Sequence, residues 1–139
     1  MSKFAVVYWS GTGNTETMAN YVAEGIQQTG NEADVLTAGE FNSNMVADYE
    51  GIAFGCPAMG AEQLEESEFE PMFEEVKSEL SGKKIVLFGS YGWGDGEWMR
   101  IWQEDCETIG VVFMADPLII NEAPSDDEEC VELGKALAA

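Results

Sequence analysis

The sequence contains no histidine, and only six of its 139 residues are basic, against 27 that are acidic. Without histidine, neither a Cys/His zinc site nor a histidine acid–base pair can form, which disfavours enzymes that rely on such groups. The formal net charge of −21 repels nucleic acid and anionic membranes and favours partner proteins with basic patches. Charge alone leaves open a simpler interpretation, in which the acidic surface only keeps the protein in solution.

The three cysteines, Cys56, Cys106 and Cys130, are too few for the four thiolates of an ordinary iron–sulfur cluster, and their spacing fits no metal motif. Their odd number and wide spacing indicate reduced thiols in the cytoplasm, and the simplest role for each is a small buried core residue. No apolar stretch approaches about 18 residues and no signal peptide is recognisable, so we expect a cytoplasmic protein without a membrane span. The length suits a single domain, residues 1–139.

Short apolar runs alternate with helical patterns along the whole chain. Apolar strands are expected at residues 4–9, 33–37, 52–55, 85–89 and 111–121, the last interrupted near Asp116-Pro117. Helical spacing predicts helices within 15–26, 69–80, 98–109 and 130–137, with a loop and a short helix at 38–50. The apolar stripe that marks the third helix, and that should face the core, comprises Trp98, Ile101, Trp102 and Ile109. This alternation predicts an α/β fold, a doubly wound five-stranded parallel sheet with helices on both faces.

Ligands of such sheets bind beyond the carboxyl ends of the strands, which directs attention to the loops after Trp9, Gly55 and Gly89. The first loop combines hydroxyl, amide and glycine residues at a helix N-terminus: Ser10, Gly11, Thr12, Gly13, Asn14 and Thr15. Its side-chain and backbone donors can hold a phosphate without a basic residue. The loop lacks the lysine of a nucleoside-triphosphate loop and the spacing of a dinucleotide loop, so a monophosphate fits best. An ordinary N-cap turn is the alternative.

The segment YWSGTGNTE at residues 8–16 resembles the phosphate loop of flavodoxins, above all the short-chain clostridial type, and the similarity covers nearly the whole chain. The resemblance implies a flavodoxin-like sheet with strand order 2-1-3-4-5 and one noncovalently bound FMN. It also implies that the first loop binds the FMN 5′-phosphate, through the side chains of Ser10, Thr12, Asn14 and Thr15 and the backbone of Gly11 and Gly13.

The second and third loops place large, polarizable side chains next to glycine. The second comprises Cys56, Pro57, Ala58, Met59, Gly60, Ala61 and Glu62, and the third comprises Ser90, Tyr91, Gly92, Trp93 and Gly94. Trp93 is a candidate stacking surface for an aromatic ligand and Met59 a soft partner for its other face, although both also fit ordinary loop positions. The resemblance implies that these two side chains enclose the isoalloxazine ring and that Glu62 accepts a hydrogen bond from flavin N3–H.

Gly60 is the residue at which we expect the backbone to change conformation during the redox cycle. Glycine permits the positive φ of a type II′ turn, so the Gly60–Ala61 peptide can flip and its carbonyl can accept a hydrogen bond from flavin N5. The resemblance implies this flip on reduction, and with it a stabilised neutral semiquinone. The surrounding acids disfavour the anionic hydroquinone. We therefore expect a low-potential electron carrier that cycles between semiquinone and hydroquinone.

Acidic residues near the two flavin loops are the expected docking groups: Glu62, Glu65, Glu66, Asp95 and Glu97. They should attract basic patches on redox enzymes, and the attraction should weaken as ionic strength rises. By the resemblance, the protein substitutes for ferredoxin with ferredoxin-type donors and acceptors, acts as a monomer, and is an electron-transfer protein rather than an enzyme.

Three other functions compete with electron transfer. A receiver-type signalling domain needs clustered acids at the end of the first strand, where Trp9-Ser10-Gly11 stands instead. A small FMN-dependent reductase needs room and side chains for a second substrate, and a cofactor-free acidic module leaves the three glycine-rich loops unexplained. The role of Asn121 stays open, because the strand that it ends either reaches the flavin or only caps the sheet.

Overall fold

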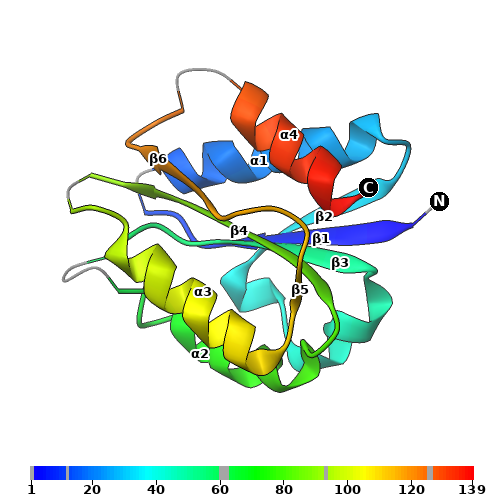
Figure 1. Cartoon of the computed structure of the whole chain (residues 1–139), viewed down its shortest axis with the longest axis horizontal. Coiled ribbons are helices and arrows are strands. Elements are labelled where there is room, and N and C mark those ends of the chain that lie inside the picture. The colour runs from blue at the N-terminus through cyan, green and yellow to red at the C-terminus, as the bar shows by residue number, and fades with distance from the viewer. Residues whose placement is uncertain (1, 12, 60–62, 93, 125–126) are drawn as a thin grey trace.

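A parallel sheet runs through the centre of the computed structural model, which describes residues 2–11, 13–59, 63–92, 94–124 and 127–139 (Figure 1). Its strands are β1 (Lys3–Tyr8), β2 (Glu32–Thr37), β3 (Gly51–Gly55), β4 (Lys84–Tyr91), β5 (Val112–Phe113) and β6 (Leu118–Asn121). They follow the order β2-β1-β3-β4-β5, with β6 paired to β4, and every pair is parallel. The predicted sheet and its strand order are confirmed.

The fifth position of the sheet is shared by two short strands. β5 pairs with the start of β4, and β6 pairs with its end. Pro117 lies between them and has no backbone N–H to donate, so the predicted interruption gives six strands in five positions. Pairing with β6 also extends β4 beyond its predicted end at Gly89, so Ser90 and Tyr91 are strand residues rather than loop residues.

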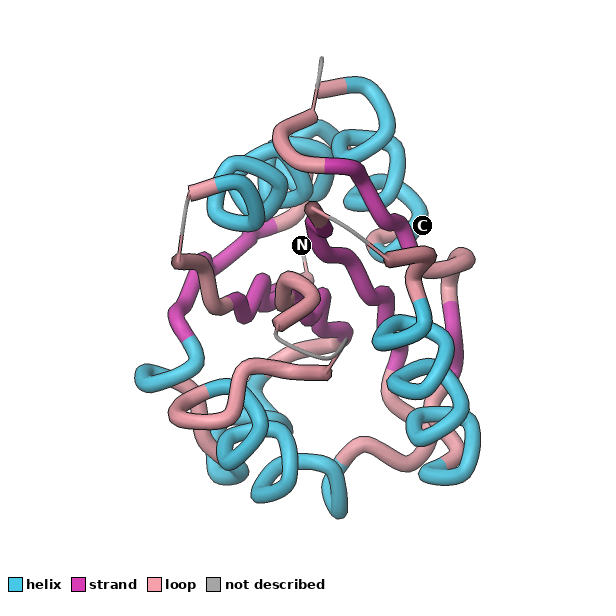
Figure 2. Tube along the Cα trace, turned by 90° about the vertical axis from the view of Figure 1, so that its left-hand side faces the viewer, coloured by secondary structure: helices cyan, strands magenta, loops and turns pink. Residues whose placement is uncertain are grey.

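Helices cover both faces of the sheet. α1 (Asn14–Gln28) and α4 (Glu128–Leu137) lie on one face, and α2 (Phe69–Val76) and α3 (Glu97–Ile109) lie on the other (Figure 2). Residues 38–50 contain two 3-10 helices, η1 (Ala38–Glu40) and η2 (Ser43–Asp48), and a third, η3 (Lys77–Glu79), continues α2 toward the predicted helix end. Within the described ranges, no helix combines the length and the apolar character needed to cross a membrane.

α1 and α4 pack so closely that each carries a glycine where a side chain would strike the backbone of the other. A Cβ atom on Gly25 would lie 2.0 Å from the carbonyl oxygen of Val131. Reciprocally, a Cβ atom on Gly134 would lie 2.0 Å from the carbonyl oxygen of Val22. This contact fixes the position of α1, whose N-terminus follows the loop after β1.

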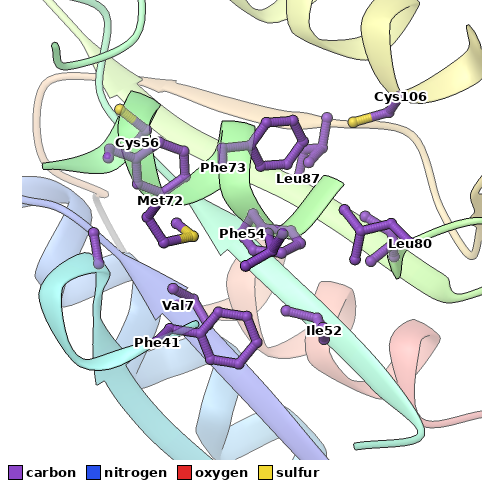
Figure 3. Packing of buried hydrophobic residues seen from close by; sticks show 14 of the residues in the cluster. Val7, Phe41, Ile52, Phe54, Cys56, Met72, Phe73, Leu80, Leu87 and Cys106 are labelled. Carbon is purple, nitrogen blue, oxygen red and sulfur yellow. The ribbon is translucent and has the colours of Figure 1, made fainter. Parts of the chain in front are cut away.

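Aromatic, aliphatic and sulfur-containing side chains fill the core on the opposite face (Figure 3). The ring of Phe54 in β3 lies 5.3 Å from that of Phe73 in α2, almost perpendicular to it. α3 buries Trp98 and Trp102 in this core as predicted, but Ile101 is 56% exposed. At about 100° per residue, Ile101 falls outside the stripe that the two tryptophans share, so its predicted burial is wrong.

Basic side chains gather at the edge of the sheet where the strands begin. The helices run against the strands, so the last turns of α2–η3 and α4 reach the edge at which β1 and β4 start, near both chain ends in Figure 1. Five of the six basic residues lie there: Lys3, Lys77, Lys83, Lys84 and Lys135. The sixth, Arg100, pairs with Asp95 at 3.1 Å. The edge where the strands end therefore has fewer basic side chains to offset its carboxylates.

Candidate functional site

A pocket of about 520 Å³ opens at the carboxyl ends of β1, β3 and β4, and this volume is within the range of small-molecule sites. All three predicted loops contribute to its wall, which comprises Trp9, Gly11, Asn14, Pro57, Ala58, Met59, Ser90, Tyr91, Gly92, Glu122 and Ala123. A second groove shares Trp9 and Gly11 with the pocket and is completed by Tyr8, Ser10, Gly13, Glu16, Thr37 and Glu68.

The loop after β1 is shaped by two glycines and a serine. Gly13 precedes α1 with a φ of 96°, and its N–H donates to the Ser10 hydroxyl at 3.0 Å. Gly11 lies against the Trp9 ring, since a Cβ there would be 3.0 Å from the indole. Because glycine is the N-cap residue, no N-cap side chain occupies the first N–H groups of α1, and an anion can pair with them.

Thr15 lies behind this loop and joins it to β4. Its side chain is buried, its hydroxyl oxygen lies 2.9 Å from that of Ser90, and the Ser90 N–H donates to the same oxygen at 3.4 Å. When the Ser90 hydroxyl is the donor of the pair, the Thr15 hydroxyl keeps its own proton for an anion in the loop. The structure therefore brings together two predicted site residues from different loops.

Backbone hydrogen bonds hold the second loop in the pocket wall. The Ala58 N–H donates to the Ser90 carbonyl at 3.0 Å, and Met59 and Gln63 exchange N–H···O bonds of 2.9 and 3.0 Å. Cys56 is buried behind the wall, where burial raises the pKa of its thiol to about 12. The thiol is therefore protonated at neutral pH, and Cys56 serves the site by packing rather than by reactivity.

The second loop is followed by a buried carboxylate. Glu65 is only 5% exposed, and it accepts hydrogen bonds of 2.8 Å from the N–H groups of Ser67, Glu68 and Phe69. Burial raises the pKa of this carboxyl, but the hydrogen bonds from Ser67, Phe69 and Glu68 outweigh burial, and the pKa is lowered overall. The predicted docking role of Glu65 is wrong, because its carboxylate is engaged inside the protein.

The end of β6 forms the wall beside β4. The Asn121 side-chain amide donates to the Tyr91 carbonyl at 3.2 Å, and the Glu122 N–H donates to the same oxygen at 2.7 Å. Asn121 thus ties the two strand ends together. The chain turns at Glu122, whose φ of 59° is uncommon outside glycine, and this turn brings Glu122 and Ala123 to the pocket.

The predicted site residues fall into five groups, the last of which lies outside the described residues. The pocket wall contains Gly11, Asn14, Pro57, Ala58, Met59, Ser90, Tyr91 and Gly92. Ser10 and Gly13 line the adjoining groove, Thr15 and Cys56 are buried, and Gly94 lies outside the wall. Thr12, Gly60, Ala61, Glu62 and Trp93 lie outside the described residues. Of the remaining predicted docking acids, Glu66, Asp95 and Glu97 are exposed.

Three residues of the wall are absent from the sequence prediction: Trp9, Glu122 and Ala123. The apolar run 4–9 places Trp9 in the first strand, but β1 ends at Tyr8 and the Trp9 indole lines the pocket. The sequence signal that could have identified Trp9 is its position as a large aromatic residue at the carboxyl end of a strand. Glu122 and Ala123 directly follow the fifth predicted strand, whose neighbour β4 also ends at the site.

The site joins a neutral anion-binding loop to a wall with flat and polarizable side chains, among them Trp9, Met59 and Tyr91. FMN offers the matching groups, a terminal phosphate and a flat aromatic ring system, so the residues present fit this cofactor. A doubly wound parallel sheet that carries such a site at its switch point defines the class of small FMN-binding α/β proteins.

Comparison with known proteins leads to the family. Residues 6–134 match the family model for flavodoxin. The chain is 46% identical to the flavodoxin of Clostridium beijerinckii over 134 residues, which cover 96% of this chain and 97% of that one. It is 46% identical to the flavodoxin of Megasphaera elsdenii over 133 residues, which cover 96% of each chain. The chain belongs to the flavodoxin family, and it is an FMN-binding electron-transfer protein rather than an enzyme.

The fold agrees with that assignment at the level of the backbone. The solution structure of two-electron reduced Megasphaera elsdenii flavodoxin matches with a TM-score of 0.91 and 45% sequence identity, covering 97% of this chain and 98% of the other. A flavodoxin structure from the domain Archaea matches with a TM-score of 0.85 at 27% identity, covering 98% of this chain and 96% of the other.

Proposed function

We propose that residues 1–139 form a single FMN-binding domain, and that this domain is a low-potential one-electron carrier able to replace ferredoxin. The observation that carries the proposal is the position of the neutral loop, which joins the end of β1 to the N-terminus of α1 at the rim of the pocket. N–H groups at a helix N-terminus, together with the helix dipole, favour an anion such as the FMN phosphate.

The first loop is assigned to the phosphate and the other two loops to the ring. The proposed phosphate ligands are the side chains of Ser10, Thr12, Asn14 and Thr15 and the backbone of Gly11 and Gly13. The residues proposed around the ring are Cys56, Pro57, Ala58, Met59, Gly60, Ala61, Glu62, Ser90, Tyr91, Gly92, Trp93 and Gly94. Bound FMN supplies the redox-active ring, and the chain holds it and shields it from water.

Individual residues around the ring have distinct proposed roles. Met59 and Trp93 cover its two faces, and Glu62 accepts a hydrogen bond from N3–H. The Gly60–Ala61 peptide is the proposed acceptor for a hydrogen bond from N5. The reciprocal bonds between Met59 and Gln63 support this role, because they hold the chain on both sides of that peptide.

The acidic surroundings of the pocket favour a low reduction potential. Glu122 lines the pocket, and Asp95 and Glu97 are exposed next to the third loop. An electron added to the cofactor increases negative charge close to these carboxylates, and repulsion opposes the addition. Every tenfold shift in the reduction equilibrium corresponds to about 1.4 kcal/mol of such repulsion.

The exposed acids also define the proposed partners. Glu66, Asp95 and Glu97 suit redox enzymes that present basic docking patches, in particular ferredoxin-type donors and acceptors. We assign the protein to the cytoplasm, where its three thiols remain reduced, and expect it to act as a monomer. Sedimentation of the FMN-loaded protein at the mass of one chain would support the monomer, whereas a dimer mass would contradict it.

Stepwise anaerobic reduction of the FMN-loaded protein tests the carrier function. We expect tight, stoichiometric FMN binding and, at half reduction, a long-wavelength absorbance band, which reports one-electron chemistry with a protonated N5. Direct oxidation of NAD(P)H by the loaded protein would point to a reductase instead. Protein that stays colourless after FMN is added would contradict the cofactor assignment.

A matched pair of variants tests the docking surface. Glu97 lies beside the third loop, and Glu32 lies at the opposite edge of the sheet, where β2 begins. Electron transfer to a basic partner should slow as salt rises, and Glu97→Gln should slow it at low salt more than Glu32→Gln does. Equal effects of the two substitutions would show that net charge, rather than a docking face, controls the encounter.

A further inference from the structure

Glu65 is the only charged side chain among the described residues that is almost completely buried. Its Oε1 atom accepts hydrogen bonds of 2.8 Å from the N–H groups of Glu68 and Phe69. Its Oε2 atom accepts one of 2.8 Å from the Ser67 N–H and another from the Ser67 hydroxyl. The N-cap residue of α2, Glu68, makes no side-chain cap of its own, so Glu65 provides the acceptors for the start of this helix.

The backbone of Glu65 connects this cap to the second loop. Its N–H donates to the Cys56 sulfur at 3.4 Å, close to the point where the loop leaves β3. The carbonyl of Cys56 in turn accepts the indole N–H of Trp98 at 3.2 Å. Ala58 and Met59, which line the pocket, lie in the chain between Cys56 and Glu65. The two sides of the loop are therefore joined at their base, directly behind the pocket wall.

The first loop is attached to the same helix start. The Trp9 indole N–H donates to the Glu68 carboxylate at 3.2 Å, and the Glu68 N–H donates to Glu65. Trp9 lines both the pocket and the adjoining groove, and its ring packs against Gly11 of the phosphate loop. Displacement of the start of α2 would consequently move two parts of the pocket wall at once.

We propose that Glu65 is a positioning residue for the FMN site, because its buried carboxylate holds the start of α2 and thereby fixes Ala58, Met59 and Trp9 in the pocket wall. This role rests on the proposed function of the pocket. One of the acids predicted to dock partner proteins is therefore a structural carboxylate.

The chemistry of the contacts requires a charged carboxylate. Four N–H or O–H donors converge on its two oxygens. The lowered pKa of Glu65 keeps it ionised at neutral pH, and a negative charge is favourable at a helix N-terminus. An amide of the same shape has one oxygen and an NH₂ group, so it would turn donors toward donors and leave part of the helix start without acceptors.

Glu65→Gln therefore separates positioning from charge, with Glu70→Gln as its matched control. Glu70 is exposed, lies in the first turn of α2 and loses the same charge on substitution. Charge alone predicts that both variants bind the anionic FMN as tightly as the wild type or more tightly, since each removes a negative charge. The positioning role predicts weaker FMN binding, and it predicts this for Glu65→Gln alone.

The experiment measures the FMN dissociation constant of each apoprotein by quenching of tryptophan fluorescence, together with the two one-electron reduction potentials and apoprotein thermal unfolding. We expect Glu65→Gln to weaken FMN binding about tenfold relative to Glu70→Gln and to change the separation of the two potentials. Ser67→Ala removes one bond to the carboxylate and keeps the charge, and it should weaken binding by about two- to threefold.

The outcomes separate failure of the positioning role from failure of the proposed function. If Glu65→Gln lowers apoprotein stability but leaves FMN affinity and both potentials equal to those of Glu70→Gln, the residue is merely structural and the proposal is overturned. If Glu65→Gln does not fold, Ser67→Ala decides, and wild-type affinity in that variant overturns the proposal. Failure of the wild-type apoprotein to bind FMN would overturn the proposed function, and the positioning role with it.

Discussion

The hydroxyl oxygens of Thr15 and Ser90 lie 2.9 Å apart and join the first turn of α1 to the end of β4 across 75 residues of sequence. We predict that Ser90→Ala weakens FMN binding about three- to tenfold, because the Thr15 hydroxyl loses the partner that orients it toward the phosphate loop. Titration of the apoprotein with FMN measures this effect. Thr108→Ala is the control, since it deletes an exposed hydroxyl that bonds only within α3.

A double-mutant cycle with Thr15→Val tests whether the two hydroxyls act together. Their effects on FMN binding should be clearly less than additive, because either substitution already breaks the shared hydrogen bond. Additive losses would mean that each side chain acts on the site independently.

The contact between α1 and α4 should make alanine costly at Gly25 and at Gly134. A methyl group at either position meets a backbone carbonyl oxygen, which cannot rotate away, so the helices must separate. Each substitution should lower the free energy of unfolding by about 1–3 kcal/mol, measured by urea denaturation. Gln27→Ala, at an exposed position of α1, should leave the free energy nearly unchanged. Equal midpoints for Gly134→Ala and the wild type would contradict the observed helix spacing.

The buried thiols should react very slowly with thiol reagents in the native protein. Burial raises the pKa of Cys56 and of Cys106 to about 12, so little thiolate forms at about pH 8 and reagents have no direct access. Ellman's reagent should react with them at least about a hundredfold more slowly in native protein than in urea. Rapid reaction of one thiol would show that its surroundings open readily, and Cys56→Ala identifies whether the opening involves the second loop.

Deprotonation of Tyr49 should lower the stability of the protein at high pH. Burial and the hydrogen bond to Asp34 raise the pKa of this phenol to about 12, whereas the unfolded chain releases the proton near pH 10. The native state therefore binds more protons between about pH 10 and 12, and the free energy of unfolding falls as pH rises through that window. Urea denaturation across this window should give a shallower decline for Tyr49→Phe. Parallel curves for the two proteins would rule out this tyrosine as the cause.

The layered fold could be predicted from the sequence because its strands are short apolar runs and its helices carry one apolar stripe each. The interruption near Pro117 was also predictable, since proline cannot supply the missing N–H. The extension of β4 through Ser90 and Tyr91 was not, because it depends on pairing with β6, a contact between segments about thirty residues apart.

The errors at the site and in α3 have a common physical origin. Glu65 stands among exposed glutamates and shares their residue type, and only the three-dimensional path of the loop turns its carboxylate toward the start of α2. Trp9 has the composition of a core residue, but the last residue of an apolar run can face the pocket once the strand has ended. Ile101 fits the helical period loosely, and tertiary packing selects the narrower stripe of Trp98 and Trp102.

The lysines at the strand-start edge make the charge of the molecule uneven along its strands. Four of these five lysines pair with carboxylates at the same edge, whereas the carboxylates near the pocket have fewer bases beside them. The uncompensated negative charge therefore lies toward the pocket end, which gives the protein an electric dipole along its strands. In the field of a positively charged surface, such a dipole experiences a torque that turns the pocket toward that surface before the two bodies touch. The molecule then reaches the partner with its pocket already turned toward the positive surface. Less rotational diffusion is needed after each collision before a productive complex forms.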